Sequence, residues 1–356
     1  MRVIISAGGT GGHIYPALSI INKIKEKDAS SEILYIGTTN RMEKDIVPKY
    51  NIKYYGIEVR GFDRKLSLKN FKTITCFLKG IKKCKKIIKE FKPDIVIGVG
   101  GYVTAPVIYA AHKCRVKTII HEQNSVLGMT NKFLSRYVDA VATSFKDTQV
   151  NAKKVVYTGN PSSEIDTSLK FDKKELNLHN NKKLVLIVMG SLGSKVVNDK
   201  FKTILPKFNN KDYEVLFITG KDYFEEFNQI KLNENIKILP YIDNLKKVFP
   251  KVDVMVTRAG ATTLSEIISY KVPSILIPSP YVTDNHQYKN ALSLVNKNAG
   301  KLILESDLES DILIKNIEEM LYNKDIKESI KNNLSAMYDK DAALKIYNLI
   351  KEVVGE

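Results

Sequence analysis

Short runs of Val, Ile and Leu alternate along this 356-residue chain with longer segments whose apolar residues recur at helical spacing. Strands buried on both faces have such continuous apolar runs, and parallel strands must be joined by crossover helices. The alternation therefore predicts an α/β fold with doubly wound parallel sheets. The expected strands are residues 3–6, 33–36, 95–99, 118–121, 140–143, 184–189, 214–219, 236–239, 252–257 and 274–278.

The chain repeats this organisation once. Residues 3–24 contain an apolar strand, the loop AGGTGG and a helix, and residues 184–205 contain LVLIVM, the loop GSLGS and a helix. Each half then has a second glycine turn, GVGGYVTAP or TRAGATTLSE. Because a single hydrophobic core rarely grows beyond about 250–300 residues, we expect two Rossmann-like domains joined near residues 158–166. All four loops should face the cleft between them, since such sheets bind ligands at the carboxyl ends of their strands.

The first glycine loop has the features of an anion site. Backbone N–H groups at a strand–helix turn, together with the helix dipole, suit a phosphate or diphosphate. His13 follows directly and could stabilise phosphate charge or accept a proton near neutral pH. A tight turn followed by a packed or capping histidine would show the same pattern. The loop lacks the Gly-Lys-Ser/Thr of a P-loop and the G-x-G-x-x-G spacing, which disfavours the ATPase and dehydrogenase classes.

Composition and patterning indicate the compartment. The three cysteines have no C-x-x-C spacing, which favours a reducing cytosol over a disulfide framework or a zinc site. The N-terminus runs into an apolar strand without the features of a signal peptide. Residues 95–111 carry no charge, but Gly100-Gly101 and Pro106 interrupt them, and a membrane span needs about 20 apolar residues. We expect a cytoplasmic protein without a spanning helix.

Positive charge is concentrated in one segment of a chain whose formal net charge is +17. Residues 60–92 contain twelve Lys or Arg against Asp63 and Glu90, interleaved with Leu, Ile and Phe. A basic amphipathic helix of this kind is typical of contact with an anionic membrane surface, although a solvated helix face would look alike. No nucleic-acid motif accompanies the charge, so we expect no nucleic-acid partner.

Several motifs, taken in order, resemble one family. They are AGGTGGH, GVGGYVTAP, HEQN at 121–124 followed by GMTN, TGNP, TRAGATTLSEI and DNHQYKNA at 284–291. This set covers nearly the whole chain and resembles the bacterial cell-wall N-acetylglucosaminyltransferases of the MurG type. The resemblance implies a GT-B fold. Residues 1–160 would form an acceptor- and membrane-facing domain, with a terminal helix at 339–356 packed back on it, and residues 161–338 would bind the UDP-sugar.

The resemblance also implies the reaction. An inverting transferase would move N-acetylglucosamine from UDP-N-acetylglucosamine to an undecaprenyl-diphosphate-linked N-acetylmuramyl-peptide, which converts lipid I to lipid II in peptidoglycan synthesis. The enzyme would work as a peripheral protein on the cytoplasmic side of the cell membrane. Two alternatives within the same fold are a glycolipid glycosyltransferase with another donor and a UDP-sugar epimerase without a lipid acceptor.

Residue by residue, the resemblance assigns His13 as the proton acceptor or a diphosphate contact. The implied donor contacts are Thr10, Gly11, Gly12, Asn124, Ser191, Ile242, Ala261, Thr262, Thr263, Glu266, His286 and Gln287. The implied acceptor contacts are Gly100, Gly101, Tyr102, His121, Glu122 and Gln123.

Structural explanations compete with several of these roles. Glu266 suits a ribose diol, but with Thr263 it also fits a capping box at a helix start. His121, Glu122 and Gln123 could be a hydrogen-bonded strand end, and Gln287 could belong to an ordinary polar turn.

Two positions depart from the family pattern. Ser163 stands where G-N-P-x-R would place an arginine, and Met189 stands where a glycine is common, so donor contacts at both positions are in doubt. The Asp-x-Asp string Asp339-Lys340-Asp341 fits the polar start of the terminal helix better than a metal site. We therefore expect neither metal nor cofactor, with the leaving UDP stabilised by helix termini, backbone donors and His286.

Overall fold

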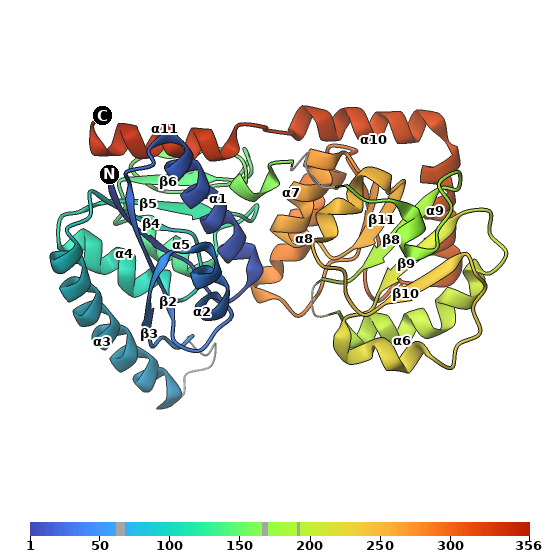
Figure 1. Ribbon diagram of the computed structural model, residues 1–356, viewed down its shortest axis with the longest axis horizontal. Helices are drawn as coiled ribbons and strands as arrows, with labels where there is room; N and C mark the ends of the chain where they lie inside the picture. The colour runs from blue at the N-terminus through green and yellow to red at the C-terminus, as the bar shows by residue number, and fades with distance from the viewer. Residues whose placement is uncertain (62–67, 166–169, 191–192) are drawn as a thin grey trace. The chain divides into compact units, whose positions relative to one another are not determined.

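The structure is a computed structural model that describes residues 1–61, 68–165, 170–190 and 193–356. They form two compact units, Met1–Glu164 with Asp339–Glu356, and Ile165–Tyr338. Each unit contains one fully parallel sheet with helices packed against it (Figure 1). The predicted α/β doubly wound architecture is therefore confirmed. Ser191 and residues 62–67 of the basic segment lie outside the described residues.

The first unit contains a seven-stranded sheet in the order β3-β2-β1-β4-β5-β6-β7. The strands are β1 (Arg2–Ser6), β2 (Glu32–Thr38), β3 (Lys53–Ile57), β4 (Ile95–Gly98), β5 (Lys117–Glu122), β6 (Ala140–Thr143) and β7 (Val155–Tyr157). The helices are α1 (Gly11–Lys27), α2 (Glu43–Ile46), α3 (Leu68–Phe91), α4 (Thr104–Lys113), α5 (Met129–Leu134) and α11 (Ala342–Val354), with 3₁₀ turns η1 (Val47–Tyr50) and η2 (Pro161–Ser163).

Successive side chains of β1 pack on opposite faces of this sheet, because side chains alternate along a strand. Val3 and Ile5 pack in a cluster with α1 and α11, which includes Ile14 and Ile346. Ile4 packs in a second cluster that includes Val107 of α4 and residues of α3. Figure 1 shows α11 crossing α1 beside the sheet. The C-terminal helix is thus part of the first unit's core.

The second unit contains a six-stranded sheet in the order β10-β9-β8-β11-β12-β13. The strands are β8 (Leu184–Val188), β9 (Glu214–Ile218), β10 (Ile236–Leu239), β11 (Val254–Thr257), β12 (Ser274–Leu276) and β13 (Lys301–Leu302). The helices are α6 (Lys195–Ile204), α7 (Ala261–Tyr270), α8 (His286–Val295), α9 (Ser310–Tyr322) and α10 (Lys324–Met337). Shorter 3₁₀ turns are η3 (Lys173–Leu176), η4 (Leu205–Phe208), η5 (Lys221–Phe227), η6 (Leu245–Lys247), η7 (Phe249–Lys251) and η8 (Thr283–Asn285).

Both sheets have a point where the strand order reverses. In the first unit it lies between β1 and β4, and in the second between β8 and β11. The loops that leave neighbouring strands in opposite directions open a crevice at such a point, where open α/β sheets bind ligands. All four glycine loops follow these four strands. Among the helices in the described residues, none is long and apolar enough to cross a membrane.

Candidate active site

The two glycine loops of the first unit pack on each other. The Gly8 N–H donates to the Gly100 carbonyl at 3.2 Å, and a Cβ on Gly101 would lie only 2.3 Å from the Gly8 oxygen. Gly100 and Gly101 also have φ values of +108° and +88°. Glycine is therefore required there by backbone conformation and by the close approach of the loops. A tight turn alone does not account for these residues.

Protein groups occupy the first half of the β1–α1 loop. The Tyr35 hydroxyl donates to the Ala7 carbonyl at 3.0 Å, and the Glu43 carboxylate accepts the Gly9 N–H at 3.1 Å. Helix α1 then begins at Gly11, after an N-cap threonine whose side chain does not cap it. The first turn of a helix has N–H groups without intrahelical partners. Residues 10–12, which are exposed or half-buried, are thus the part of this loop suited to meet an anion or a sugar.

His13 is the third residue of α1 and lies over the second glycine loop. Its Nδ1 is 3.1 Å from the Gly8 carbonyl oxygen and 3.4 Å from the Thr10 hydroxyl. A carbonyl only accepts, so Nδ1 carries the proton in the bond to Gly8, and the neutral ring then has its lone pair on Nε2. A Cβ on Gly100 would lie 2.9 Å from Nε2. The structure thus brings His13 together with Gly100.

His121 and Gln123 lie beneath these loops and are buried. His121 Nε2 donates to the Gly159 carbonyl at 3.1 Å, and Nδ1 accepts from the Gln123 amide at 2.9 Å. The same amide donates to the Val99 carbonyl at 2.8 Å. Burial lowers the pKa of His121 to about 4, so the ring is neutral at physiological pH. The pair links the end of β5 to the loops after β4 and β7.

Glu122 organises the loop that follows β5. Its Oε1 accepts both the backbone and the side-chain amide of Asn124, each at 2.9 Å. Its Oε2 accepts the Gly128 N–H at 3.0 Å and the Asn131 amide at 2.8 Å. Glu122 is buried, whereas Asn124 is half-buried. The carboxylate therefore holds the loop in the shape that presents Asn124.

Tyr102 behaves differently from its neighbours, because half of it is exposed. Its ring covers Gly61, where an added Cβ would lie 2.8 Å from Tyr102 Cε2. The aromatic ring is thus available at the surface beside Gly100 and Gly101.

Ser163 and Met189, the two residues that depart from the family pattern, are both buried. Ser163 in η2 is buried and donates to the Asn160 carbonyl at 2.6 Å, while the Asn160 side chain caps the same turn. Met189 is 3% exposed, and the following Gly190 has a φ of +83° without any atom near an added Cβ. In the same loop Gly193 has a φ of +75°, and a Cβ added to it would lie 2.1 Å from the Thr219 carbonyl oxygen, so the close backbone approach is at Gly193.

The capping-box explanation of Glu266 is wrong. Helix α7 begins at Ala261 with Gly260 as its N-cap and no side-chain cap, so Thr263 and Glu266 lie inside the helix. The N–H groups of the first turn therefore belong to Ala261, Thr262 and Thr263 and have no partner within the helix.

Glu266 itself has an unusual environment. Its side chain is 16% exposed, and Oε1 lies 3.9 Å from Lys246 Nζ. Burial raises its pKa to about 7, against the opposing effect of the lysine. The carboxyl group is therefore close to half-protonated at neutral pH.

Arg258 is a buried charged residue beside the second unit's loops that the sequence alone does not single out. It follows β11, is 7% exposed and forms an ion pair with the buried Glu305. It also donates to the Ser194 hydroxyl at 2.7 Å and to the Ile277 carbonyl at 3.1 Å. Arg258 thus ties together the segments after β8, β11, β12 and β13. The one available signal was a charge in a loop that continues a buried strand, since a buried charge requires partners.

Three further predicted donor contacts follow β10 and β12. His286 and Gln287 begin α8, after Asp284 and Asn285 with left-handed φ values of 53° and 51°. His286 Nδ1 donates to the Thr283 carbonyl at 2.8 Å, and Gln287 Oε1 accepts the Ser279 N–H at 2.9 Å. Ile242 is half-buried in the loop after β10. The polar turn considered for Gln287 is therefore present, and its hydrogen bonds orient the side chains of His286 and Gln287 at the start of α8.

The Asp-x-Asp string lies just before α11. Asp339 pairs with Lys345 and accepts the Asp341 N–H at 3.2 Å. Throughout the described ranges, the structure contains no group of three or more His, Cys, Asp or Glu that could hold a metal ion.

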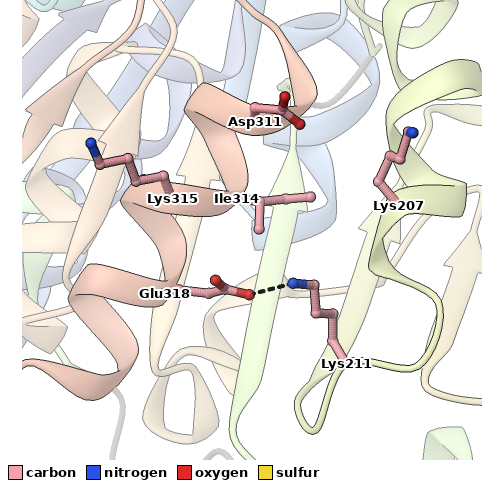
Figure 2. A pocket seen from close by; sticks show the side chains of 6 residues that line it. All are labelled: Lys207, Lys211, Asp311, Ile314, Lys315 and Glu318. Carbon is pink, nitrogen blue, oxygen red and sulfur yellow. Dashed lines mark hydrogen bonds and ion pairs between the residues drawn. The ribbon is translucent and has the colours of Figure 1, made fainter.

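The second unit also contains a depression of about 560 Å³ (Figure 2). Figure 2 shows Lys211 reaching toward Glu318 of α9, and the two groups are 2.7 Å apart. The lining of this depression contains none of the predicted site residues. The remaining lining residues are Lys207, Asp311, Ile314 and Lys315.

Two family profiles match this chain. Residues 3–143 match the glycosyltransferase family 28 N-terminal domain, and residues 184–346 match the family 28 C-terminal domain. A protein of Halalkalibacterium halodurans is 46% identical over 361 residues, which is 99% of both chains. A protein of Bacillus cytotoxicus is 47% identical over 363 residues, which is 99% of this chain and 100% of the relative. Both are named UDP-N-acetylglucosamine--N-acetylmuramyl-(pentapeptide) pyrophosphoryl-undecaprenol N-acetylglucosamine transferase.

Solved structures agree at the level of the fold. MurG of Acinetobacter baumannii is 28% identical, with a TM-score of 0.79 over 99% of both chains. A putative UDP-N-acetylglucosamine 2-epimerase of Listeria monocytogenes has a TM-score of 0.73 at 15% identity, over 99% of this chain and 96% of its own. The second similarity concerns the fold alone.

Proposed function

Because the chain belongs to glycosyltransferase family 28, we propose that it transfers N-acetylglucosamine from UDP-N-acetylglucosamine to an undecaprenyl-diphosphate-linked N-acetylmuramyl-peptide. The observation that carries this proposal is the 46–47% identity to transferases of that name over 99% of the chain. The product of this reaction is lipid II, the disaccharide precursor of peptidoglycan.

His13 acts as the base in this proposal. The acceptor hydroxyl attacks the anomeric carbon of the donor, the new C–O bond forms on the opposite face, and the bond to UDP breaks with its electron pair. The hydroxyl proton passes to Nε2 of His13, which is the acceptor nitrogen when Nδ1 donates to the Gly8 carbonyl. The configuration at the anomeric carbon is inverted.

The second unit holds the nucleotide. The first turn of α7, at Ala261, Thr262 and Thr263, directs N–H groups and the positive end of its dipole at the donor's diphosphate. Glu266 accepts hydrogen bonds from the ribose diol, and the backbone of Ile242 contacts uracil. Ser191 is assigned to the diphosphate by its motif alone. These preorganised donors stabilise the departing UDP without a metal.

For the transferred sugar we propose contacts in each unit, assigned from the motifs. In the second unit, His286 and Gln287 stand at the start of α8, and Gln287 reads the sugar hydroxyls. In the first unit, the sugar contacts come from Thr10, Gly11, Gly12 and Asn124.

The acceptor's diphosphate meets the loop of Gly100, Gly101 and Tyr102. His121, Glu122 and Gln123 act by positioning rather than by contact, because all three are buried and bonded to neighbouring loops. Residues 1–160 with 339–356 then form the acceptor domain, and residues 161–338 form the donor domain.

Helix α3 contacts the anionic inner leaflet as a peripheral surface. Phe71, Ile74 and Leu78 are 70%, 45% and 58% exposed, and their spacing places them on one helix face. The same helix presents a cluster of lysines, Lys79, Lys82, Lys83, Lys85, Lys86 and Lys89. Apolar side chains beside lysines suit an interface of acyl chains and anionic headgroups. The lipid tail can then stay in the bilayer while the head group reacts.

The test is a donor and acceptor screen on the purified chain, read by mass spectrometry. We expect a product heavier by one N-acetylhexosamine only when UDP-N-acetylglucosamine and an undecaprenyl-diphosphoryl-N-acetylmuramyl-peptide are both present. Isomerisation of UDP-N-acetylglucosamine without acceptor would indicate an epimerase. Preference for UDP-glucose with another glycolipid would indicate a different transferase.

A further inference from the structure

A buried carboxylate lies directly behind the first glycine loop. Glu43, the first residue of α2, has no exposed surface. Its Oε1 accepts the Thr38 N–H at 3.0 Å and the Thr38 hydroxyl at 2.7 Å. Its Oε2 accepts the Gly9 N–H at 3.1 Å. Three donors therefore converge on one acidic side chain.

The backbone around Glu43 is shaped to admit it. A Cβ on Gly8 would lie 2.3 Å from Glu43 Oε1, and a Cβ on Gly37 would lie 2.8 Å from Glu43 Cγ. A buried charge is costly to a fold unless hydrogen bonds compensate it. Gly8 and Gly37 therefore leave the space that the Glu43 side chain occupies.

The Gly8–Gly9 peptide connects Glu43 to His13. The N–H of this peptide, on Gly9, donates to Glu43, and its carbonyl, on Gly8, faces His13 Nδ1 at 3.1 Å. Carbonyl and N–H point in opposite directions across a planar trans peptide. Fixing the N–H on Glu43 therefore aims the carbonyl at the imidazole. Hydrogen bonds in series also polarise one another, so the carboxylate makes this carbonyl a stronger acceptor.

We propose that Glu43 is a positioning residue for His13, acting through the Gly8–Gly9 peptide. The relay holds the proton on Nδ1 and the lone pair on Nε2, and it stabilises the imidazolium formed when Nε2 takes the acceptor's proton. This inference rests on the proposed function, in which His13 is the base. A carboxylate that orients a histidine directly is common at catalytic and metal sites. Here a peptide unit stands between the two groups.

An acid is needed at position 43 because every partner donates. A carboxylate accepts at both oxygens, whereas a glutamine presents an NH₂ on one side. In Glu43→Gln that NH₂ must face the N–H of either Gly9 or Thr38, so the isosteric change breaks the network. Glu43→Asp keeps the charge but is shorter by one methylene, so it cannot hold Thr38 and Gly9 together.

Asp139 offers a matched control. Its carboxylate accepts the Thr118 N–H at 2.9 Å and the Thr118 hydroxyl at 3.2 Å, which is the same pairing that Glu43 makes with Thr38. Thr118 lies at the start of β5 and Asp139 just before β6. Both are therefore at the amino ends of the strands, whereas the glycine loops follow the carboxyl ends. Asp139→Asn therefore removes a similar interaction without touching the relay.

The first readout is the imidazole of His13, observed by ¹⁵N NMR in the full chain labelled at its five histidines and assigned with His13→Gln. We expect one Nδ1–H tautomer in wild type and in Asp139→Asn, and mixed tautomers in Glu43→Gln and Glu43→Asp. This readout does not depend on transfer activity, so it judges the relay even if the proposed reaction is wrong.

The second readout is kinetic. Each Glu43 variant should lose about tenfold in kcat, with KM for donor and acceptor within about threefold of wild type, while Asp139→Asn keeps kcat within about twofold. A fixed Nδ1–H tautomer in the Glu43 variants would overturn the relay, as would equal losses in Asp139→Asn. If Glu43→Gln does not fold, Glu43→Asp carries the same criteria.

Discussion

Gly100 and His13 pack so closely that a Cβ on Gly100 would lie 2.5 Å from Cδ2 of the imidazole. In Gly100→Ala the new methyl group must displace the ring, and the φ of +108° is strained for any side chain. We expect kcat to fall by about a hundredfold and the free energy of unfolding to fall by about 1–3 kcal/mol. Kinetics and denaturant unfolding measure the two effects.

Gly355→Ala separates backbone strain from the clash. Gly355 has a φ of +87° with nothing within 4 Å of an added Cβ, so this variant should lose about 1 kcal/mol and retain full turnover. Normal kcat in Gly100→Ala would mean that the imidazole position is unimportant.

His13→Ala should lower kcat by about a hundredfold or more, because it removes the proposed proton acceptor. The steady-state rate with saturating donor and acceptor is the measurement, and circular dichroism checks the fold. Turnover within about threefold of wild type in a folded variant would remove His13 from the mechanism.

The interior strands could be predicted because burial on both faces leaves a continuous apolar signal. All ten expected strands are present, but β3, β7 and β13 were not predicted. Each is an edge strand and partly exposed, so its sequence mixes apolar residues with lysine or tyrosine. Such short mixed segments are indistinguishable from loops without the partner strand.

The glycine loops of the site could also be predicted from the sequence, since glycine marks close backbone approach. The buried charged residues that hold these loops could not be predicted, because they lie far in sequence from the residues they contact. Glu43 is 34 residues from Gly9, and Arg258 is 47 residues from Glu305. An isolated charge in a sequence is most often a solvated one, and only the folded chain shows which charges are enclosed.

Glu266 should make donor binding depend on pH. With a pKa of about 7, the carboxylate that accepts from the ribose diol is mostly protonated near pH 6 and mostly ionised near pH 8. Calorimetry with UDP-N-acetylglucosamine should show affinity rising by up to about tenfold over this range, and Glu266→Gln should be weak and pH-independent. Lys246→Met should move the midpoint upward, because the lysine lowers the pKa of Glu266. A flat wild-type profile would contradict the diol role.

Glu266 should also make the stability of the fold depend on pH, in the opposite direction to donor binding. Because the folded-state pKa of Glu266 is raised above its ordinary value, the native state favours the proton. Stability is then greatest below the unfolded-state pKa and is lost as the pH rises through about 7. Glu266→Gln should therefore unfold at a higher temperature than wild type near pH 8, with the difference shrinking near pH 4. An unchanged difference across this range would show that burial does not raise this pKa.

The basic surface of α3 should matter only when the acceptor is in a membrane. Each lysine near an anionic leaflet contributes roughly 1 kcal/mol, screened by salt. Lys83 is unsuitable for the test because it donates to the Gly56 carbonyl and lies over Tyr55. The test variant therefore replaces four exposed lysines with glutamine, Lys79, Lys82, Lys86 and Lys89.

The matched control replaces four exposed lysines of the second unit, Lys231, Lys315, Lys324 and Lys331, so that both variants lose equal charge. Sedimentation with anionic vesicles should show weaker binding for the α3 variant and near-normal binding for the control. Turnover of membrane-embedded acceptor should slow in the α3 variant, while turnover of a water-soluble short-chain acceptor stays close to wild type, because the glycine loops are untouched. Equal losses in both variants would reduce the effect to net charge, and unchanged vesicle binding would make the lysines an ordinary solvated face.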